Sequence, residues 1–109
     1  MAAAVPGPTR TVEEVAEVMK ALGHPLRLRL VILLAEGDEH VGGLAERLGI
    51  AQAIASQQLR ILRMSGLVAA TRDGGFAVYR LREPRLHKLL RCMGLHPAQP
   101  PTSASEASR

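Results

Sequence analysis

Apolar residues recur at helical spacing from just after the first ten residues to the middle of the chain. The first such stretch opens at Thr11, which has Glu14 three residues later as in a capping box, and it stops at Gly23. The second stretch opens at Pro25, which suits the first turn of a helix, and ends at Gly37. Because this second stretch is apolar nearly all round, we expect it to be the buried central helix.

The pattern then continues as two shorter helices before it changes to the pattern of strands. Apolar spacing predicts a helix over 41–48 and another over about 52–65. The segments LVAATR and FAVYRL flank Asp-Gly-Gly at 73–75, which predicts a hairpin because a type I′ turn needs positive φ at both central residues. A last helix is expected from about residue 83, with an apolar stripe of Leu86, Leu89, Leu90 and Met93. The predicted fold is mainly α with a β-hairpin (α+β), in the order α-α-α-α-β-β-α.

Chain length and composition predict one folded domain. The 109 residues leave no room for two cores. Residues 1–10 are mostly Ala, Pro and Gly, and residues 97–109 are mostly Pro, Ser and Ala, so we expect both ends to be disordered. The folded domain is expected over 11–96.

The net charge of +4 conceals an uneven distribution along the sequence. Residues 11–59 hold four basic and seven acidic side chains, whereas residues 60–96 hold eight basic and two acidic ones. This basic second half predicts an anionic partner. The single cysteine, Cys92, excludes an intrachain disulfide, and no signal peptide or membrane-length apolar run is present, so we expect a cytoplasmic protein without a membrane partner. With no nucleophile–base arrangement and no phosphate-binding loop, we expect no enzyme.

One face of the predicted helix over 52–65 has the chemistry needed to contact DNA bases. At about 100° per residue, Ala53, Ser56, Gln57 and Arg60 share this face. Small residues allow close approach to a base, Ser and Gln donate and accept hydrogen bonds, and Arg60 can contact a phosphate. With the preceding helix, this predicts a helix-turn-helix. The alternative is an ordinary solvated face. Gln58 falls within the apolar arc, as a candidate buried amide with a backbone partner.

Three segments together carry a family resemblance: ALGHPLRLRLVILLAEG, GGLAERLGIAQAIASQQLRILRMSGLV and DGGFAVYRL. They resemble the ArsR-type (ArsR/SmtB) winged-helix transcriptional regulators, over about residues 15–93. The resemblance implies a homodimeric repressor that leaves operator DNA when an inducer binds, with a recognition helix at 51–64 and a wing at 72–76. Ala51 departs from the family's frequent serine and cannot cap the helix. By position, the implied DNA-contacting residues are Ala51, Gln52, Ala53, Ser56, Gln57, Arg60, Arg72, Gly74 and Gly75.

The first and last helices carry apolar stripes that are large for one small subunit to cover. We therefore expect them to meet a second copy across a two-fold axis, as the resemblance also implies. A winged-helix module that binds protein and no DNA is the alternative function, which the basic second half disfavours. The expected dimer residues are Val12, Val15, Met19, Leu86, Leu90 and Met93.

The inducer is the feature that the sequence leaves open. At the position of a cysteine pair in metal-sensing relatives, this chain has His40 and Gly42, so the thiolate site is absent. At a second metal site of the family, Glu83 and His96 match, but Arg85 and Gln99 replace the other ligands. We expect no metal and no cofactor, with Glu83 and His96 left as a candidate remnant. Cys92 is either a redox-sensitive thiol or a packing residue.

Overall fold

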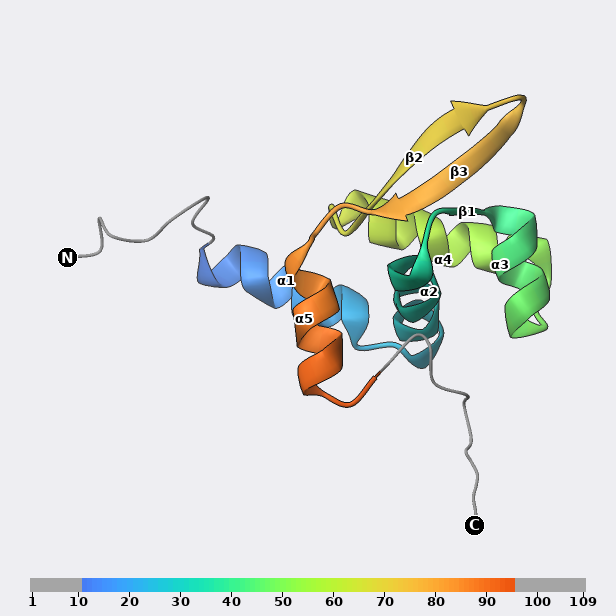
Figure 1. The fold of residues 1–109 in the computed structure, drawn as a ribbon. Coiled ribbons are helices and arrows are strands. Elements are labelled where there is room, and N and C mark those ends of the chain that lie inside the picture. The colour runs from blue at the N-terminus through green and yellow to red at the C-terminus, as the bar shows by residue number, and fades with distance from the viewer. Residues whose placement is uncertain (1–10, 96–109) are drawn as a thin grey trace, which may run out of the picture.

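The computed structural model describes residues 11–95, so the N-terminal segment 1–10, His96 and the tail 97–109 lie outside the described residues. Within that range the chain forms five helices and a small sheet (Figure 1). In chain order the elements are α1 (Val12–Leu22), α2 (Pro25–Glu36), β1 (Glu39–His40), α3 (Val41–Leu48), α4 (Gln52–Met64), β2 (Val68–Asp73), β3 (Phe76–Leu81) and α5 (Arg85–Cys92).

The first two helices begin as the sequence predicts. The Thr11 hydroxyl accepts a hydrogen bond from the backbone N–H of Glu14 at 3.1 Å, and the Glu14 carboxylate accepts one from the N–H of Thr11 at the same distance. This capping box satisfies two N–H groups that α1 would otherwise leave free. At the start of α2, Nδ1 of His24 accepts from the N–H of Leu26, and Pro25 occupies the first helical position.

The sheet has three antiparallel strands in the order β1-β3-β2, one more than the predicted hairpin. The hairpin itself is confirmed, with Asp73 paired to Phe76 and φ values of 61° at Gly74 and 91° at Gly75. Both central residues of the turn therefore have positive φ. The sequence reading missed β1, which adds Glu39 and His40 to the free edge of β3. Two residues are too few to show the alternation that identifies a strand.

The core is built from leucines around α2. Leu30, Val31 and Leu34 of α2 are buried, and leucines of α3 and α4 close over them. Leu86 and Leu90 are each 2% exposed and belong to this same core. The expectation that these two residues face a second subunit is therefore wrong, because their side chains are already covered by their own subunit. Met93, the last residue of the predicted apolar stripe, lies just after the end of α5 and is 67% exposed.

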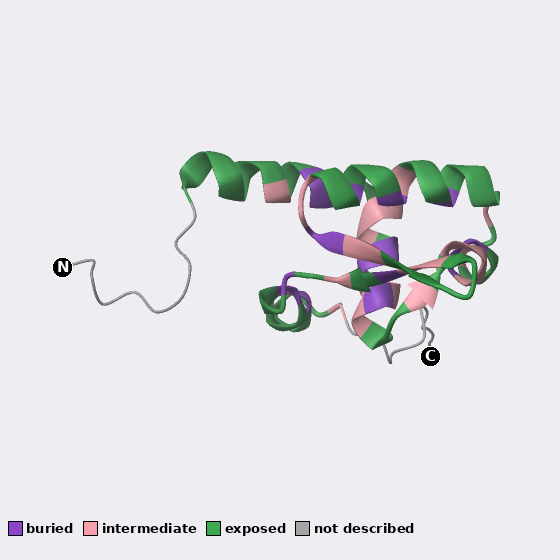
Figure 2. Ribbon diagram, turned by 90° about the horizontal axis from the view of Figure 1, so that it is seen from above, coloured by how far each residue is buried: buried purple, intermediate pink, exposed green. Residues whose placement is uncertain are grey.

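Helix α1 is attached to the core at its C-terminal end. Ala21 and Leu22 are buried, whereas Val12 and Met19 are 80% and 50% exposed. Figure 2 shows α1 extending beyond the rest of the molecule, with most of its surface open to solvent. The subunit itself therefore leaves an apolar side of α1 uncovered.

Candidate DNA-binding surface

Helices α3 and α4 form the helix-turn-helix. One side of α4 packs into the core. It carries Ala55, Leu59 and Leu62, which are fully buried. The opposite side is therefore open to solvent. At the N-terminus of α4, Ala51 is the capping position and makes no side-chain hydrogen bond, as the sequence predicts. The structure leaves every predicted contact residue of this segment exposed: Ala51, Gln52, Ala53, Ser56, Gln57 and Arg60.

Gln58 lies at the border of the buried side of α4 and has a charged partner. Its Oε1 accepts a hydrogen bond from Nη1 of Arg27 on α2 at 2.9 Å. Nε of the same guanidinium donates to the backbone oxygen of Ala21 at the end of α1, at 2.7 Å. The sequence suggested a backbone partner for this amide. The actual partner lies 31 residues away along the chain, too distant for any local pattern to indicate.

The wing carries the other predicted contact residues at its tip. Arg72, Gly74 and Gly75 are exposed, and Nη1 of Arg72 donates to the Gly75 oxygen at 3.3 Å. This hydrogen bond holds the guanidinium over the turn. Phe76, which the sequence reading did not single out, is 65% exposed and lies beside the His40 ring. Its position directly after the predicted turn could have indicated that Phe76 lies at the exposed tip of the wing.

Two further cations extend the surface, of which the sequence indicated Arg80 beside the hairpin and did not indicate Arg63. Arg63 is exposed on α4, three residues after Arg60, and helical spacing of three places the two on neighbouring positions. Arg80 is exposed on β3. Exposed guanidinium groups can contact phosphates at several points along a duplex.

Comparison with known proteins identifies the family. The sequence model for bacterial regulatory proteins of the arsR family matches residues 24–70. A biofilm growth-associated repressor from Xylella fastidiosa (strain Temecula1 / ATCC 700964) is 44% identical over 80 residues, which are 73% of this chain and 70% of that protein. The chain belongs to the arsR family.

Solved structures of arsR-family and related regulators share the fold. The crystal structure of the transcriptional repressor BigR from Xylella fastidiosa has a TM-score of 0.69 and 43% identity, covering 74% of this chain and 83% of that one. The homodimeric winged helix-turn-helix DNA-binding domain from Mycobacterium bovis has a TM-score of 0.71 and 30% identity, covering 84% and 88%. The fold of this arsR-family protein is therefore a winged helix-turn-helix.

The positions of the family's metal sites are engaged in other contacts here. Glu83 is buried, and its Oε2 accepts from Nε of Arg85 at 2.8 Å. This hydrogen bond, together with the Glu83 charge, raises the pKa of the Arg85 guanidinium, so a fixed cation adjoins the carboxylate. Nδ1 of His40 accepts from the N–H of Gly43 and caps α3. Within residues 11–95, no three His, Cys, Asp or Glu side chains gather as metal ligands.

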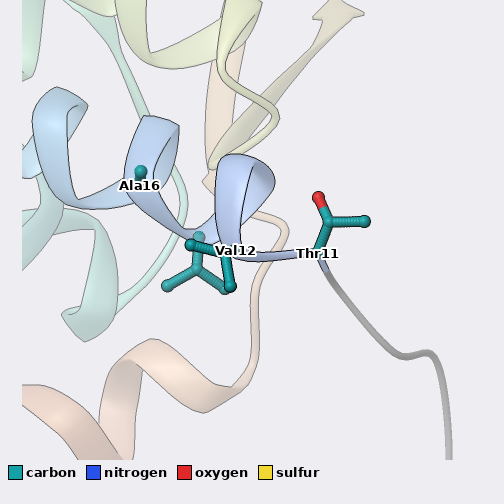
Figure 3. Close-up of a pocket in the computed structure, with 4 residues that line it drawn as sticks. Thr11, Val12 and Ala16 are labelled. Carbon is teal, nitrogen blue, oxygen red and sulfur yellow. The ribbon is translucent and has the colours of Figure 1, made fainter.

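The exposed side of α1 forms a second candidate surface in this arsR-family protein. Thr11, Val12, Val15 and Ala16 line a shallow, mostly apolar hollow (Figure 3).

Cys92, at the end of α5, is exposed. Of the two alternatives that the sequence left open for this residue, the buried packing residue is therefore excluded. Within the described part of the chain, no helix has the length and apolar character needed to cross a bilayer.

Proposed function

We propose that this arsR-family protein is a homodimeric repressor that binds operator DNA through α4 and the wing. The observation that carries this proposal is the exposed polar side of α4, backed by a fully buried leucine side and adjoined by a wing that presents Arg72. A helix held in this way can enter a major groove, and the wing can contact the flanking backbone. Such a repressor acts in the cytoplasm, where operator DNA lies.

The residues of α4 divide into two roles by their chemistry. Gln57 and Ser56 donate and accept hydrogen bonds, which base edges in the major groove require. Ala53 has no bulk to prevent close approach or contact with a thymine methyl group. Arg60 and Arg72 carry fixed positive charge suited to phosphate oxygens, and these contacts supply affinity without sequence information.

Assembly follows from the open surface of α1. Val12, Val15 and Met19 are exposed apolar residues on that helix, and Met93 adds to them from the end of α5. A second copy is the occupant that we propose for this surface, as in the homodimeric domain from Mycobacterium bovis. A two-fold axis would set two copies of α4 about one DNA turn, ~34 Å, apart.

Charge adds support for contact between α1 and α5 of different subunits. Three exposed glutamates lie on α1, and three exposed cations lie on α5. Opposite charges at the rim of an apolar surface favour one orientation of the two subunits over others. These charged residues are Glu13, Glu14 and Glu17 on α1, and Arg85, Lys88 and Arg91 on α5.

Footprinting of the DNA upstream of the protein's own gene tests this function. We expect protection of two half-sites related by two-fold symmetry. Binding to that fragment should weaken steeply as salt increases, because phosphate contacts release counterions. A module that binds protein and no DNA would protect nothing and would show no salt-dependent duplex binding, which would overturn the proposal.

A further inference from the structure

Arg27 joins three helices through a single guanidinium group. Its side chain starts from α2, its Nε bonds the Ala21 oxygen of α1, and its Nη1 bonds the Gln58 amide of α4. Figure 2 shows α1 and α4 along the same edge of the molecule, so this group lies where the proposed dimer helix approaches the proposed recognition helix. We call the set Arg27, Ala21 and Gln58 the guanidinium joint.

The geometry of arginine makes the joint stiff. The guanidinium is planar, and its N–H groups point in fixed directions, so two acceptors bound to it are held at a fixed angle. Arg27 is half-buried. Because its guanidinium is charged and water is partly excluded around it, its hydrogen bond to Gln58 is stronger than the same bond in water. A lysine at the same position would keep the charge, but its ammonium would not hold the two oxygens in one plane.

Gln58 itself is unsuited to contact a base. The exposed side of α4 is centred opposite Ala55, Leu59 and Leu62, whereas Gln58 adjoins that buried arc and its Oε1 is occupied by Arg27. Its neighbours one turn away in each direction, Ile54 and Ile61, are partly exposed apolar residues without hydrogen-bonding groups. Any influence of Gln58 on DNA recognition must therefore act through the direction of α4.

We propose that Arg27 and Gln58 are positioning residues for DNA recognition, and that the guanidinium joint fixes the direction of α4 relative to α1. This inference rests on the proposed function, because it concerns how the two recognition helices of a dimer match two half-sites. A tilt of α4 displaces the contact residues at its outer surface, and base contacts tolerate displacement far less than phosphate contacts do. Loss of the joint should therefore lower operator preference more than general DNA affinity.

The test compares Gln58→Met with Gln58→Glu in the full-length protein. Methionine keeps the length of the side chain and removes the acceptor, whereas glutamate keeps an acceptor for Arg27. The measured quantity is the ratio of the Kd for random duplex to the Kd for the protected operator fragment. This ratio cancels the general loss of affinity that the added charge of glutamate causes on both duplexes.

We expect Gln58→Met to lower the ratio about tenfold, near the lower end of the range of factors that corresponds to one lost hydrogen bond to a charged group. Gln58→Glu should keep the ratio within about threefold of the wild type. Arg27→Lys should lower the ratio like Gln58→Met, and the double variant should fall no further, since both changes break the same contact. Arg29→Lys, an exposed arginine on the same helix, is the matched control and should leave the ratio unchanged.

A purely structural role for the joint predicts a different result. Gln58→Met would then lower the melting temperature and weaken binding to both duplexes equally, with an unchanged ratio, and this would overturn the inference. If the wild type itself does not prefer the protected fragment, the proposed function fails instead. The two failures are thus distinguishable.

A measurement without DNA keeps the inference testable in that second case. Spin labels at Lys20→Cys and Arg63→Cys, in a Cys92→Ser background with excess unlabelled protein, report the distance between α1 and α4. We expect a narrow distance distribution with Gln58 or Gln58→Glu and a broader one with Gln58→Met. Equal widths in all three would overturn the positioning role.

Discussion

The rings of His40 and Phe76 lie against each other, with centroids 5.8 Å apart and planes tilted by 32°. His40 caps α3 with its Nδ1, and its backbone pairs with Val78 of β3. Phe76 opens β3 directly after the wing turn. These contacts connect the first helix of the helix-turn-helix to the wing, which we propose to contact DNA beside α4.

Replacing Gln57 should reduce sequence preference. We expect Gln57→Ala to weaken operator binding by about 1–3 kcal/mol, because an amide contact to a base edge is lost, and to leave binding to random duplex nearly unchanged. Fluorescence anisotropy with both duplexes measures the two affinities. Equal losses on both duplexes would show that Gln57 contacts no base.

Replacing the basic residues should have the opposite signature. Arg60→Ala and Arg72→Ala should weaken binding to both duplexes by similar factors, because phosphates are present in every sequence. The slope of log K against log salt should become shallower by about 1 for each variant. An unchanged slope would remove that arginine from the phosphate contacts.

A charge on the open side of α1 should separate the subunits without unfolding them. We expect Met19→Glu to sediment as a monomer with lost operator binding, since half-exposed Met19 belongs to the surface proposed to meet a second copy. Leu90→Ala is the contrasting variant, because Leu90 is buried in its own subunit. It should lower the free energy of unfolding by about 2–5 kcal/mol. A dimeric Met19→Glu protein would contradict the proposed interface.

The wing turn should tolerate asparagine and resist valine. At Gly74, with φ of 61°, an added Cβ would meet no atom within 4 Å, so the cost of substitution is conformational rather than steric. Gly74→Asn creates the Asn-Gly pair that type I′ turns favour and should be close to neutral. Gly74→Val should destabilise the hairpin by about 1–2 kcal/mol, measured by chemical denaturation. Equal stabilities for the two variants would argue against a left-handed turn.

Metal ions should not weaken binding of the protein to its operator. The Glu83 carboxylate is bonded to Arg85, whose charge repels a cation, and Nδ1 of His40 is used as a helix cap. We expect micromolar zinc, nickel, cadmium or arsenite to release no DNA in a gel-shift assay. Release by one of these metals in the wild type, abolished by Glu83→Ala with His96→Ala, would show that the remnant site binds metal.

The exposed thiol of Cys92 should be reactive in the native protein. We expect one thiol per chain to react with a disulfide reagent without denaturant, because the side chain is open to solvent. If this thiol transmits a signal, peroxide should release DNA from the wild type and not from Cys92→Ser. The same response in both proteins would leave Cys92 without a regulatory role.

Helix boundaries and the wing turn were predictable because local chemistry determines them. The capping box at Thr11, the Gly-Gly turn and the apolar stripes each depend on residues that lie only a few positions apart in the sequence. Strand β1 was not predictable, because its two residues form a strand only by pairing with Tyr79 and Val78. That pairing depends on a tertiary contact between segments far apart in the sequence.

Spacing also does not reveal whether an apolar stripe packs inside its own subunit or stays on the surface. The stripes of α1 and α5 look alike in the sequence, yet Leu86 and Leu90 pack inside the subunit and Met19 faces solvent. The same limit applies to the site, where spacing placed Gln57 outside and left Gln58 without its partner. Only the packing of α2 against α4 brings Arg27 to that amide.

The projection of α1 from the rest of the molecule would make thermal stability depend on concentration in the proposed dimer. If a second copy covers Val12, Val15 and Met19, association stabilises the folded state by mass action. Dilution would then lower the melting temperature, and the part of α1 that lies outside the core would lose helical content before the leucine core opens. The stability of this protein would thus be set by its abundance as well as by its sequence.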